Sequence, residues 1–227
     1  MKTAIIQSNY LPWLGYFNII SLVDNFVFYD EMQYTKRDWR NRNYIKTPEG
    51  KLLLTVPVKT KGNYQEKIKY IEIADSSWGE NHLKSIIHNY KNAKYFEEIH
   101  DLIFEILLDK KIKLLSKLNQ SLIIKISNYL ELETKFFNSS KYLLNGDQTE
   151  NLIEVCKDMN TTKYISGPYG KQYIDFEKFE KENINLHIFD YPVYPEYNQL
   201  WNDEFLPNLS ILDCLFNCGK EARKLLC

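Results

Sequence analysis

Side chains that could hold an anion are concentrated in residues 33–43. This segment places four cationic and three amide side chains around one tryptophan, Trp39. A guanidinium group offers a planar fork of donors that matches phosphate and carboxylate oxygens. We therefore predict that Lys36, Arg40 and Arg42 bind such a group beside Trp39. The alternative is a solvated loop whose charges pair with nearby carboxylates.

A second group of polar and aromatic side chains follows the apolar run 4–6. Gln7 and Asn9 come first, and Tyr10 and Trp13 follow within a short loop. Polar groups at the carboxyl end of a buried strand are typical of ligand sites in open parallel sheets. We expect the amides to bind a ligand and the rings to stack on a flat base or sugar. Alternatively, the two rings simply cover the end of the sheet.

Two residues are candidates for proton transfer. Asp30 ends the second apolar run, 25–29, so its carboxyl group should lie at the same sheet edge. His82 lies one helical turn from Trp78 and from Ile86, so it flanks the buried face of a predicted helix. We predict that His82 or Asp30 acts as a general base. A lone histidine beside an apolar face can equally be a structural hydrogen-bonding group.

A third candidate region lies at 166–173, where two glycines would let backbone amides approach a ligand. Its spacing is not that of a phosphate-binding P-loop, and a structural turn is an equal alternative. Near the C-terminus, Ser210 fits a helix cap, whereas a later asparagine on the same helix has no evident local role. The residues predicted from these two regions to bind substrate are Ser166, Gly167, Lys171, Tyr173 and Asn217.

Composition restricts the class of protein. The chain has 227 residues, with 29 basic and 30 acidic side chains, so no net charge favours nucleic acid. No apolar stretch is long enough to cross a membrane, and the opening strand leaves no room for a signal peptide. Four late cysteines, the last at 227, include no CxxC pair. We expect cytoplasmic localisation, no metal site and no membrane insertion, and no motif identifies a cofactor.

The pattern of apolar residues predicts alternating strands and helices. Such alternation favours a mainly parallel, Rossmann-like α/β sheet forming a single domain over 1–227, with 44–130 as a hairpin and helical elaboration. Ser77 and Glu80 fit a capping box before the first long helix. The expected strands are 4–6, 25–29, 44–47, 52–56, 69–73, 135–138, 163–166 and 184–189. The expected helices are one opened by Gly15, then 78–90, 95–108, 112–130, 147–159, 176–182 and one that begins near 210, after a loop over 191–208.

Four motifs, in order, resemble the WbqC-like protein family over essentially the whole chain. They are Ile-Ile-Gln-Ser-Asn-Tyr-Leu-Pro-Trp-Leu-Gly-Tyr-Phe (5–17), Trp-Arg-Asn-Arg-Asn (39–43), Ser-Gly-Pro-Tyr-Gly-Lys (166–171) and Pro-Asn-Leu-Ser-Ile-Leu-Asp (207–213). Ser8 departs from the proline expected there. A weaker likeness is to the nucleotidyltransferase and pantothenate-synthetase-like superfamily. Here 12–15 lacks both histidines of its His-x-Gly-His signature, so that phosphate chemistry is not implied.

The family resemblance implies a role in bacterial surface-polysaccharide (O-antigen) biosynthesis, for which glycyl or other acyl transfer to a sugar has been proposed. We accordingly expect an N-acyl or aminoacyl transferase. Its substrate is expected to be a small molecule, an amino sugar linked to a nucleotide. The acyl donor is open: a thioester, an aminoacyl-tRNA or an adenylate would fit, and the neutral charge makes tRNA the least favoured. The rival hypothesis is a non-catalytic protein that binds sugar nucleotides in the same pathway.

Overall fold

A five-stranded, entirely parallel sheet forms the centre of the protein in a computed structural model that describes residues 1–60, 65–142, 144–201 and 204–226. Its strand order is β5-β2-β1-β6-β7, and its carboxyl ends share one edge. From β1 the chain adds β2 and β5 on one side and then β6 and β7 on the other. The carboxyl ends of β1, β2 and β6 therefore form a topological switch point. The strands are β1 Lys2–Ile6, β2 Asn25–Phe28, β5 Lys135–Asn138, β6 Lys163–Ser166 and β7 Asn185–Ile188.

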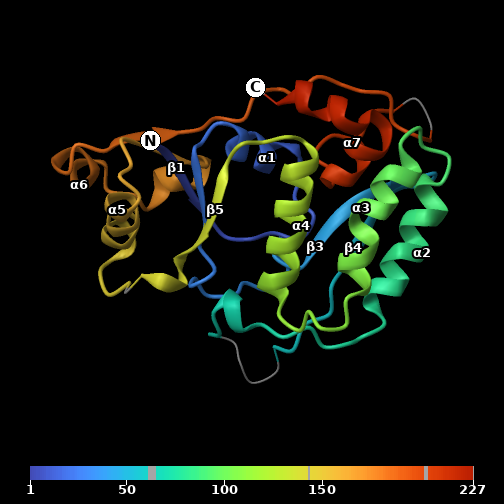
Figure 1. Cartoon of the computed structure of the whole chain (residues 1–227), viewed down its shortest axis with the longest axis horizontal. Helices are drawn as coiled ribbons and strands as arrows, with labels where there is room; N and C mark the ends of the chain where they lie inside the picture. Colours follow the sequence, from blue (N-terminus) through green and yellow to red (C-terminus); the bar gives the residue numbers. More distant parts are fainter. Residues whose placement is uncertain (61–64, 143, 202–203, 227) are drawn as a thin grey trace.

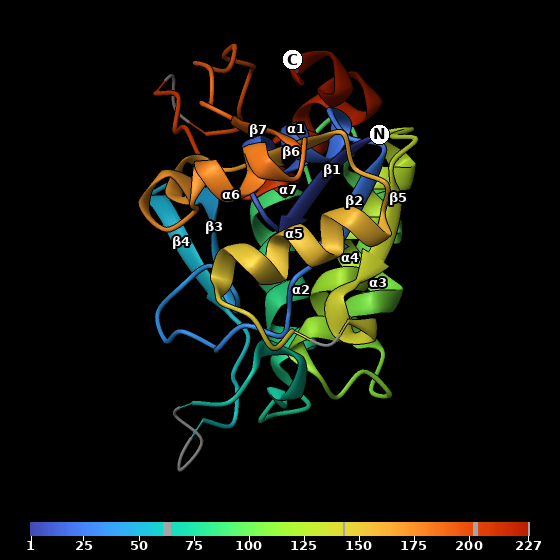
Figure 2. The same cartoon turned by 90° about the vertical axis from the view of Figure 1, so that its left-hand side faces the viewer.

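Both faces of the sheet are buried, as the apolar runs predicted. Ala4 and Phe26 point into one core, whereas Ile5 and Val27 point into another. Helices α5 (Gln148–Asp158) and α6 (Phe176–Lys181) cover the second face, as Figure 2 shows. Helices α1 (Leu14–Ser21) and α4 (Leu115–Tyr129) cover the first (Figure 1).

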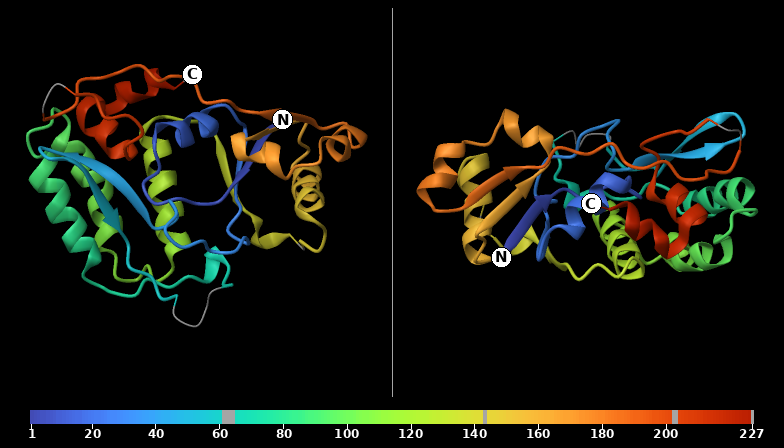
Figure 3. Two further views of the ribbon diagram at one scale, coloured as in Figure 1. Left: turned by 180° about the vertical axis from the view of Figure 1, so that it is seen from behind. Right: turned by 90° about the horizontal axis from the view of Figure 1, so that it is seen from above.

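A hairpin and further helices extend the molecule beyond α4. Strands β3 (Arg42–Thr47) and β4 (Gly50–Thr55) pair antiparallel. They lie beside α2 (Trp78–Tyr90), α3 (Phe96–Leu108) and the terminal helix α7 (Ile211–Cys218) (Figure 3). Their apolar residues join the core that α1 and α4 share, so one continuous core links the hairpin to the sheet.

Most predicted elements agree with the structure, including the mainly parallel α/β class, but one strand does not exist. Residues 69–73 were expected as a strand, whereas Ile68–Tyr70 form a turn of 3-10 helix that buries Ile68 and then Ile71. Ile68 and Ile71 share a face because residues three apart eclipse in a 3-10 helix, whereas in a strand they would point to opposite faces. The Ser77 capping box is also absent, because the Ser77 hydroxyl donates to Asp75. Asp147 caps α5, the helix expected from 147, and it forms a capping box with Glu150.

No helix within the described part of the chain has the length and apolar character needed to cross a membrane.

Candidate functional site

Arg40 joins the polar loop after β2 to the polar end of β1. Its guanidinium donates to the side-chain oxygen of Asn9 and, over 3.2 Å, to Gln7 Oε1. A third contact, 3.6 Å long, pairs it with Asp38. The side chain as a whole retains 15% of its accessible surface. Two of the predicted binding segments therefore meet at one sheet edge.

Asp30 lies beside this cluster and is buried. Its Oδ1 accepts a hydrogen bond of 2.8 Å from the Ser8 backbone N–H, and its Oδ2 accepts one of 2.7 Å from the Gln120 amide. Burial raises the pKa of Asp30 above its ordinary value, while these two donors and the charge of Arg40 lower it in part. A carboxylate has about four acceptor positions, and these two hydrogen bonds occupy two of them.

Two adjacent side-chain amides of α4 hold Asp30 and the backbone around Ser8 and Arg40 in place. Asn119 donates to the backbone oxygen of Arg40 over 2.8 Å and to that of Ser8 over 3.4 Å. Gln120, the next residue, binds Asp30. A single helix thus holds the end of β1, the end of β2 and the Arg40 segment together.

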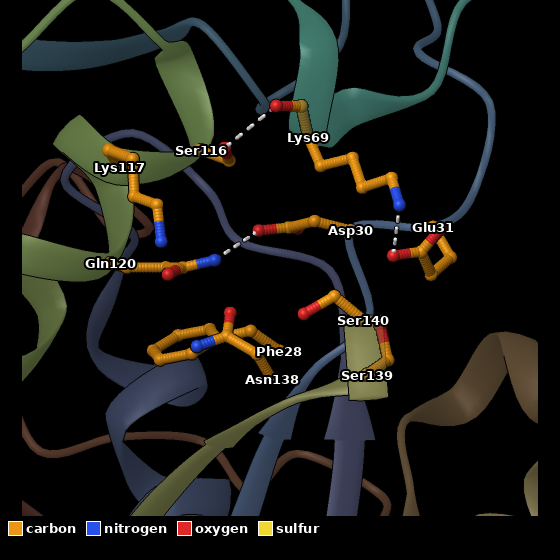
Figure 4. Close-up of a pocket in the computed structure, with 10 residues that line it drawn as sticks. All are labelled: Phe28, Asp30, Glu31, Lys69, Ser116, Lys117, Gln120, Asn138, Ser139 and Ser140. Carbon is orange, nitrogen blue, oxygen red and sulfur yellow. Dashed lines mark hydrogen bonds and ion pairs between the residues drawn. The ribbon is translucent and has the colours of Figure 1, made fainter. Parts of the chain in front are cut away.

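A pocket of about 180 Å³ opens next to Asp30, between the carboxyl ends of β2 and β5 and the first turns of α4 (Figure 4). Asp30 lies between Gln120 on one side and Glu31 on the other. Glu31 pairs with Lys69 over 2.8 Å and with Lys67 over 3.3 Å. The lining residues are Phe28, Asp30, Glu31, Lys69, Ser116, Lys117, Gln120, Asn138, Ser139 and Ser140.

His82 and Tyr10 are buried together, away from solvent. His82 Nε2 lies 3.2 Å from the Thr55 backbone oxygen, which can only accept, so Nε2 carries the proton. Nδ1 then accepts from the Tyr10 hydroxyl over 2.8 Å. Burial lowers the pKa of His82 to about 4. Both ring nitrogens are occupied within the fold, and the Tyr10 ring presents no exposed face for stacking.

Trp13 is half-buried in an aromatic group that lies over the start of α1. Its ring makes edge contacts with Tyr191 at 4.8 Å and with Tyr194 at 5.7 Å between centroids. A Cβ on Gly15 would lie 2.4 Å from the Trp13 ring, so this packing requires glycine there. The Trp13 ring packs against the segment that follows β7, and among the described residues it makes no hydrogen bond or ring contact with Arg40.

The other predicted residues of the Arg40 segment differ in exposure. Trp39 is 48% exposed and touches Tyr44 by its edge, with ring centroids 6.1 Å apart. Lys36 is exposed. Arg42 begins β3 and is half-buried, and its Nε has no hydrogen-bond partner among the described residues.

The segment after β6 lies at the same sheet edge, on the other side of β1. Ser166 is buried, and a Cβ on Gly170 would lie 2.3 Å from its hydroxyl, so the turn needs glycine at 170. Gly167 begins this turn. Lys171 pairs with Asp190 over 3.3 Å, and Tyr173 is 48% exposed. No hydrogen bond joins these side chains to Arg40 or Asp30 among the described contacts.

Asn217 has a local role that its sequence context concealed. Its amide donates to the Asp213 backbone oxygen over 2.7 Å within α7. Asp213 itself is buried and accepts from the hydroxyls of Tyr90 and Tyr197, each over 2.8 Å. This network ties α7 to α2 and to the segment after β7, so its evident contribution is structural.

The sequence did not predict that α4 holds the site together, or that Ser139 and Ser140 after β5 line the pocket. Asn119 and Gln120 lie in a helix with the expected apolar periodicity, and both are buried among apolar neighbours. Two adjacent amides on the buried side of a helix are a usable signal, because buried polar groups require partners. No group of three or more His, Cys, Asp or Glu side chains is placed to hold a metal ion in the described residues.

The fold is that of an α/β protein with polar side chains and a pocket at the carboxyl ends of a parallel sheet. The chain belongs to the WbqC-like protein family, whose model matches residues 7–225. It is similar to the uncharacterized protein Rv1507c of Mycobacterium tuberculosis, with 45% identity over 221 residues, which are 97% of this chain and 95% of the relative. No solved structure matches the chain.

Proposed function

We propose that the protein is a transferase of bacterial surface-polysaccharide (O-antigen) biosynthesis that moves an acyl or aminoacyl group, such as glycyl, to the amino group of a nucleotide-linked sugar. The observation that supports this most is the position of Asp30. This carboxylate is buried at the sheet edge, beside a pocket and near the partly exposed Arg40 side chain. A base and an anion-binding group are the two features that the reaction requires.

Asp30 replaces His82 as the favoured base. A sugar ammonium must lose a proton before it attacks, and a base works best when its pKa approaches the working pH. Burial raises the pKa of Asp30 in that direction, whereas His82 has both nitrogens bonded within the fold. The proton moves to a free position on Asp30. The amine lone pair then forms the new C–N bond, the bond from the acyl carbon to its carrier breaks, and the carrier leaves with that electron pair and takes up the second amine proton.

Arg40 is the favoured ligand for the diphosphate, with Lys36 and Arg42 as further cations of the same segment. Gln7 and Asn9 hold the Arg40 guanidinium, so its orientation is set before the ligand arrives. Such preorganisation reduces the entropy lost on binding. Trp39, Trp13 and the 166–173 segment remain candidates for contacts with the base or the acyl donor.

Incubation of the protein with an amino-sugar nucleotide and each class of donor, followed by mass spectrometry, tests this function. The donors are an acyl thioester, an aminoacyl-tRNA, and an amino acid with ATP, which can form an adenylate in place. A mass gain on the sugar nucleotide that requires the protein supports the transferase. Binding of the sugar nucleotide without turnover by any donor supports instead the non-catalytic alternative. That alternative gains weight from the two hydrogen bonds that already hold Asp30.

The proposed setting is the cytoplasm. Cys156, Cys214 and Cys218 are free thiols, which is the usual state in a reducing compartment. Cys227 lies outside the described residues.

A further inference from the structure

We infer that the pocket between the carboxyl ends of β2 and β5 and the first turns of α4 is the subsite for a single amino-sugar ring, and that the nucleotide diphosphate lies outside it on the Arg40 side of Asp30. This inference rests on the proposed function, because it assigns the acceptor of that reaction to a specific cavity.

The size of the pocket limits its occupant. At about 180 Å³ it falls below the roughly 300–1,000 Å³ typical of sites that enclose a whole drug-sized ligand. One sugar ring with its substituents fits such a space, whereas a complete nucleotide sugar does not. The remainder of the ligand must therefore leave through the mouth of the pocket.

The lining is polar in the manner that a sugar requires. Three hydroxyls, two amides, two carboxylates and two ammonium groups surround the space, and Phe28 is the one aromatic residue that lines it in the described structure. Sugar hydroxyls both donate and accept, so they need a mixed set of partners. Ser116, Ser139, Gln120 and Asp30 are buried there, which means that their positions are fixed by the fold.

The charges of the lining are largely balanced. Glu31 retains 9% of its side-chain surface and is paired with Lys69 over 2.8 Å and with Lys67 over 3.3 Å. Lys117 makes no ion pair among the described residues, and its ammonium group extends toward Gln120 (Figure 4). Asp30 is the remaining acidic group. A neutral or weakly charged ring fits this balance better than a phosphate does.

The position of Asp30 orients the ring. Asp30 lines the pocket, and the Ser8 N–H that binds it belongs to the same short segment as Gln7 and Asn9, which hold Arg40. Asn119 binds the backbone oxygens of both Ser8 and Arg40. A ligand with its diphosphate at Arg40 therefore places its sugar at Asp30, with the amino group facing the proposed base.

Isothermal titration with UDP, UDP-glucose and UDP-glucosamine tests the assignment. The wild-type protein should bind UDP-glucosamine more tightly than UDP. The variants Asn138→Ala and Ser140→Ala remove exposed pocket side chains, so neither should impair folding. Each should reduce the affinity for UDP-glucosamine about two- to tenfold, the range expected for one hydrogen bond, without changing the affinity for UDP.

Matched controls are available on the far side of the sheet and before α2. Asn185→Ala changes an exposed asparagine on the opposite edge strand, and Ser76→Ala changes an exposed serine outside the pocket. Both should bind all three probes as the wild type does. The inference is overturned if Asn138→Ala and Ser140→Ala leave the affinity for UDP-glucosamine unchanged, or if they weaken UDP to the same extent.

The turnover assay separates this inference from the proposed function. If the wild type forms an acylated sugar and the pocket variants keep its KM for the amino-sugar nucleotide, the pocket assignment fails and the transferase stands. If the pocket variants lose the sugar contribution to binding and no donor gives product, the transferase fails and the subsite stands.

Discussion

The side-chain amide of Gln120 donates a hydrogen bond of 2.7 Å to Oδ2 of Asp30, across 90 positions of sequence. This contact connects α4 to the carboxyl end of β2. It also leaves Asp30 as a buried carboxyl group with donors on both oxygens and a pocket at its side. A carboxylate that is held in this way keeps one orientation, which is what a general base requires.

Replacement of Asp30 with Asn should lower turnover by about a hundredfold or more, because the amide cannot accept the amine proton. Binding of the sugar nucleotide should persist, because asparagine keeps the size of the side chain and one of its two acceptor oxygens. Kinetics and calorimetry on the same preparation measure the two effects. Asp101→Asn, an exposed change on α3, is the control and should behave as the wild type. Retention of full activity in Asp30→Asn would show that the base lies elsewhere.

The pH dependence of turnover should change when Gln120 is replaced. Its amide bond to Asp30 lowers the pKa of that carboxyl group, so Gln120→Ala should raise this pKa further. A base is inactive when protonated, and the acidic limb of the pH–rate profile should therefore move to higher pH. Asn128→Ala changes an exposed amide on the same helix and should leave the limb in place. If the acidic limb does not shift in Gln120→Ala, Asp30 is not the base whose protonation limits the rate.

Binding of a nucleoside diphosphate should depend on Arg40. Loss of one charge-assisted contact costs about 1.5–3 kcal/mol, so Arg40→Ala should weaken binding roughly tenfold to a hundredfold. Lys113→Ala removes an exposed cation from the segment before α4 and serves as the control. Calorimetry with UDP measures both. Equal affinities in the two variants would mean that the 33–43 segment is only a solvated loop.

The sheet could be predicted from sequence because its strands are short apolar runs with clear ends. Their apolar character on both faces predicted a mainly parallel sheet, in which Ala4 and Phe26 prove to be direct partners. The prediction of a strand at 69–73 was wrong because the spacing of apolar residues in so short a segment does not identify its secondary structure. The 3-10 turn still matters, because Lys69 lines the pocket.

The site could be predicted only in part. The meeting of Arg40 with Gln7 and Asn9 followed from the rule that parallel strands end at one edge. The roles of Asn119 and Gln120 did not, because they depend on how α4 crosses that edge, which is a tertiary relationship. His82 was placed correctly beside the buried face, yet sequence could not show that Tyr10 and Thr55 occupy both of its nitrogens.

The stability of the protein should fall in acid because of His82. Burial lowers its pKa from 6.5 to about 4 in the folded state, whereas the unfolded chain keeps the ordinary value. Between these pH values the unfolded state binds a proton that the folded state does not. The free energy of unfolding therefore decreases as the pH falls from about 6.5 to about 4, by roughly 3 kcal/mol in total. Urea denaturation at a series of pH values measures this change.

A matched pair of variants isolates this histidine from the other titrating groups. Asp30 and Asp213 act in the opposite direction, because burial raises their pKa values and the folded state then binds the extra proton. His82→Gln should lose the His82 contribution, so its stability should fall less than that of the wild type between pH 6.5 and pH 4. His88→Gln, an exposed change on the same helix, should keep the wild-type slope. Parallel slopes in the wild type and His82→Gln would show that His82 is not held neutral by burial beside Tyr10.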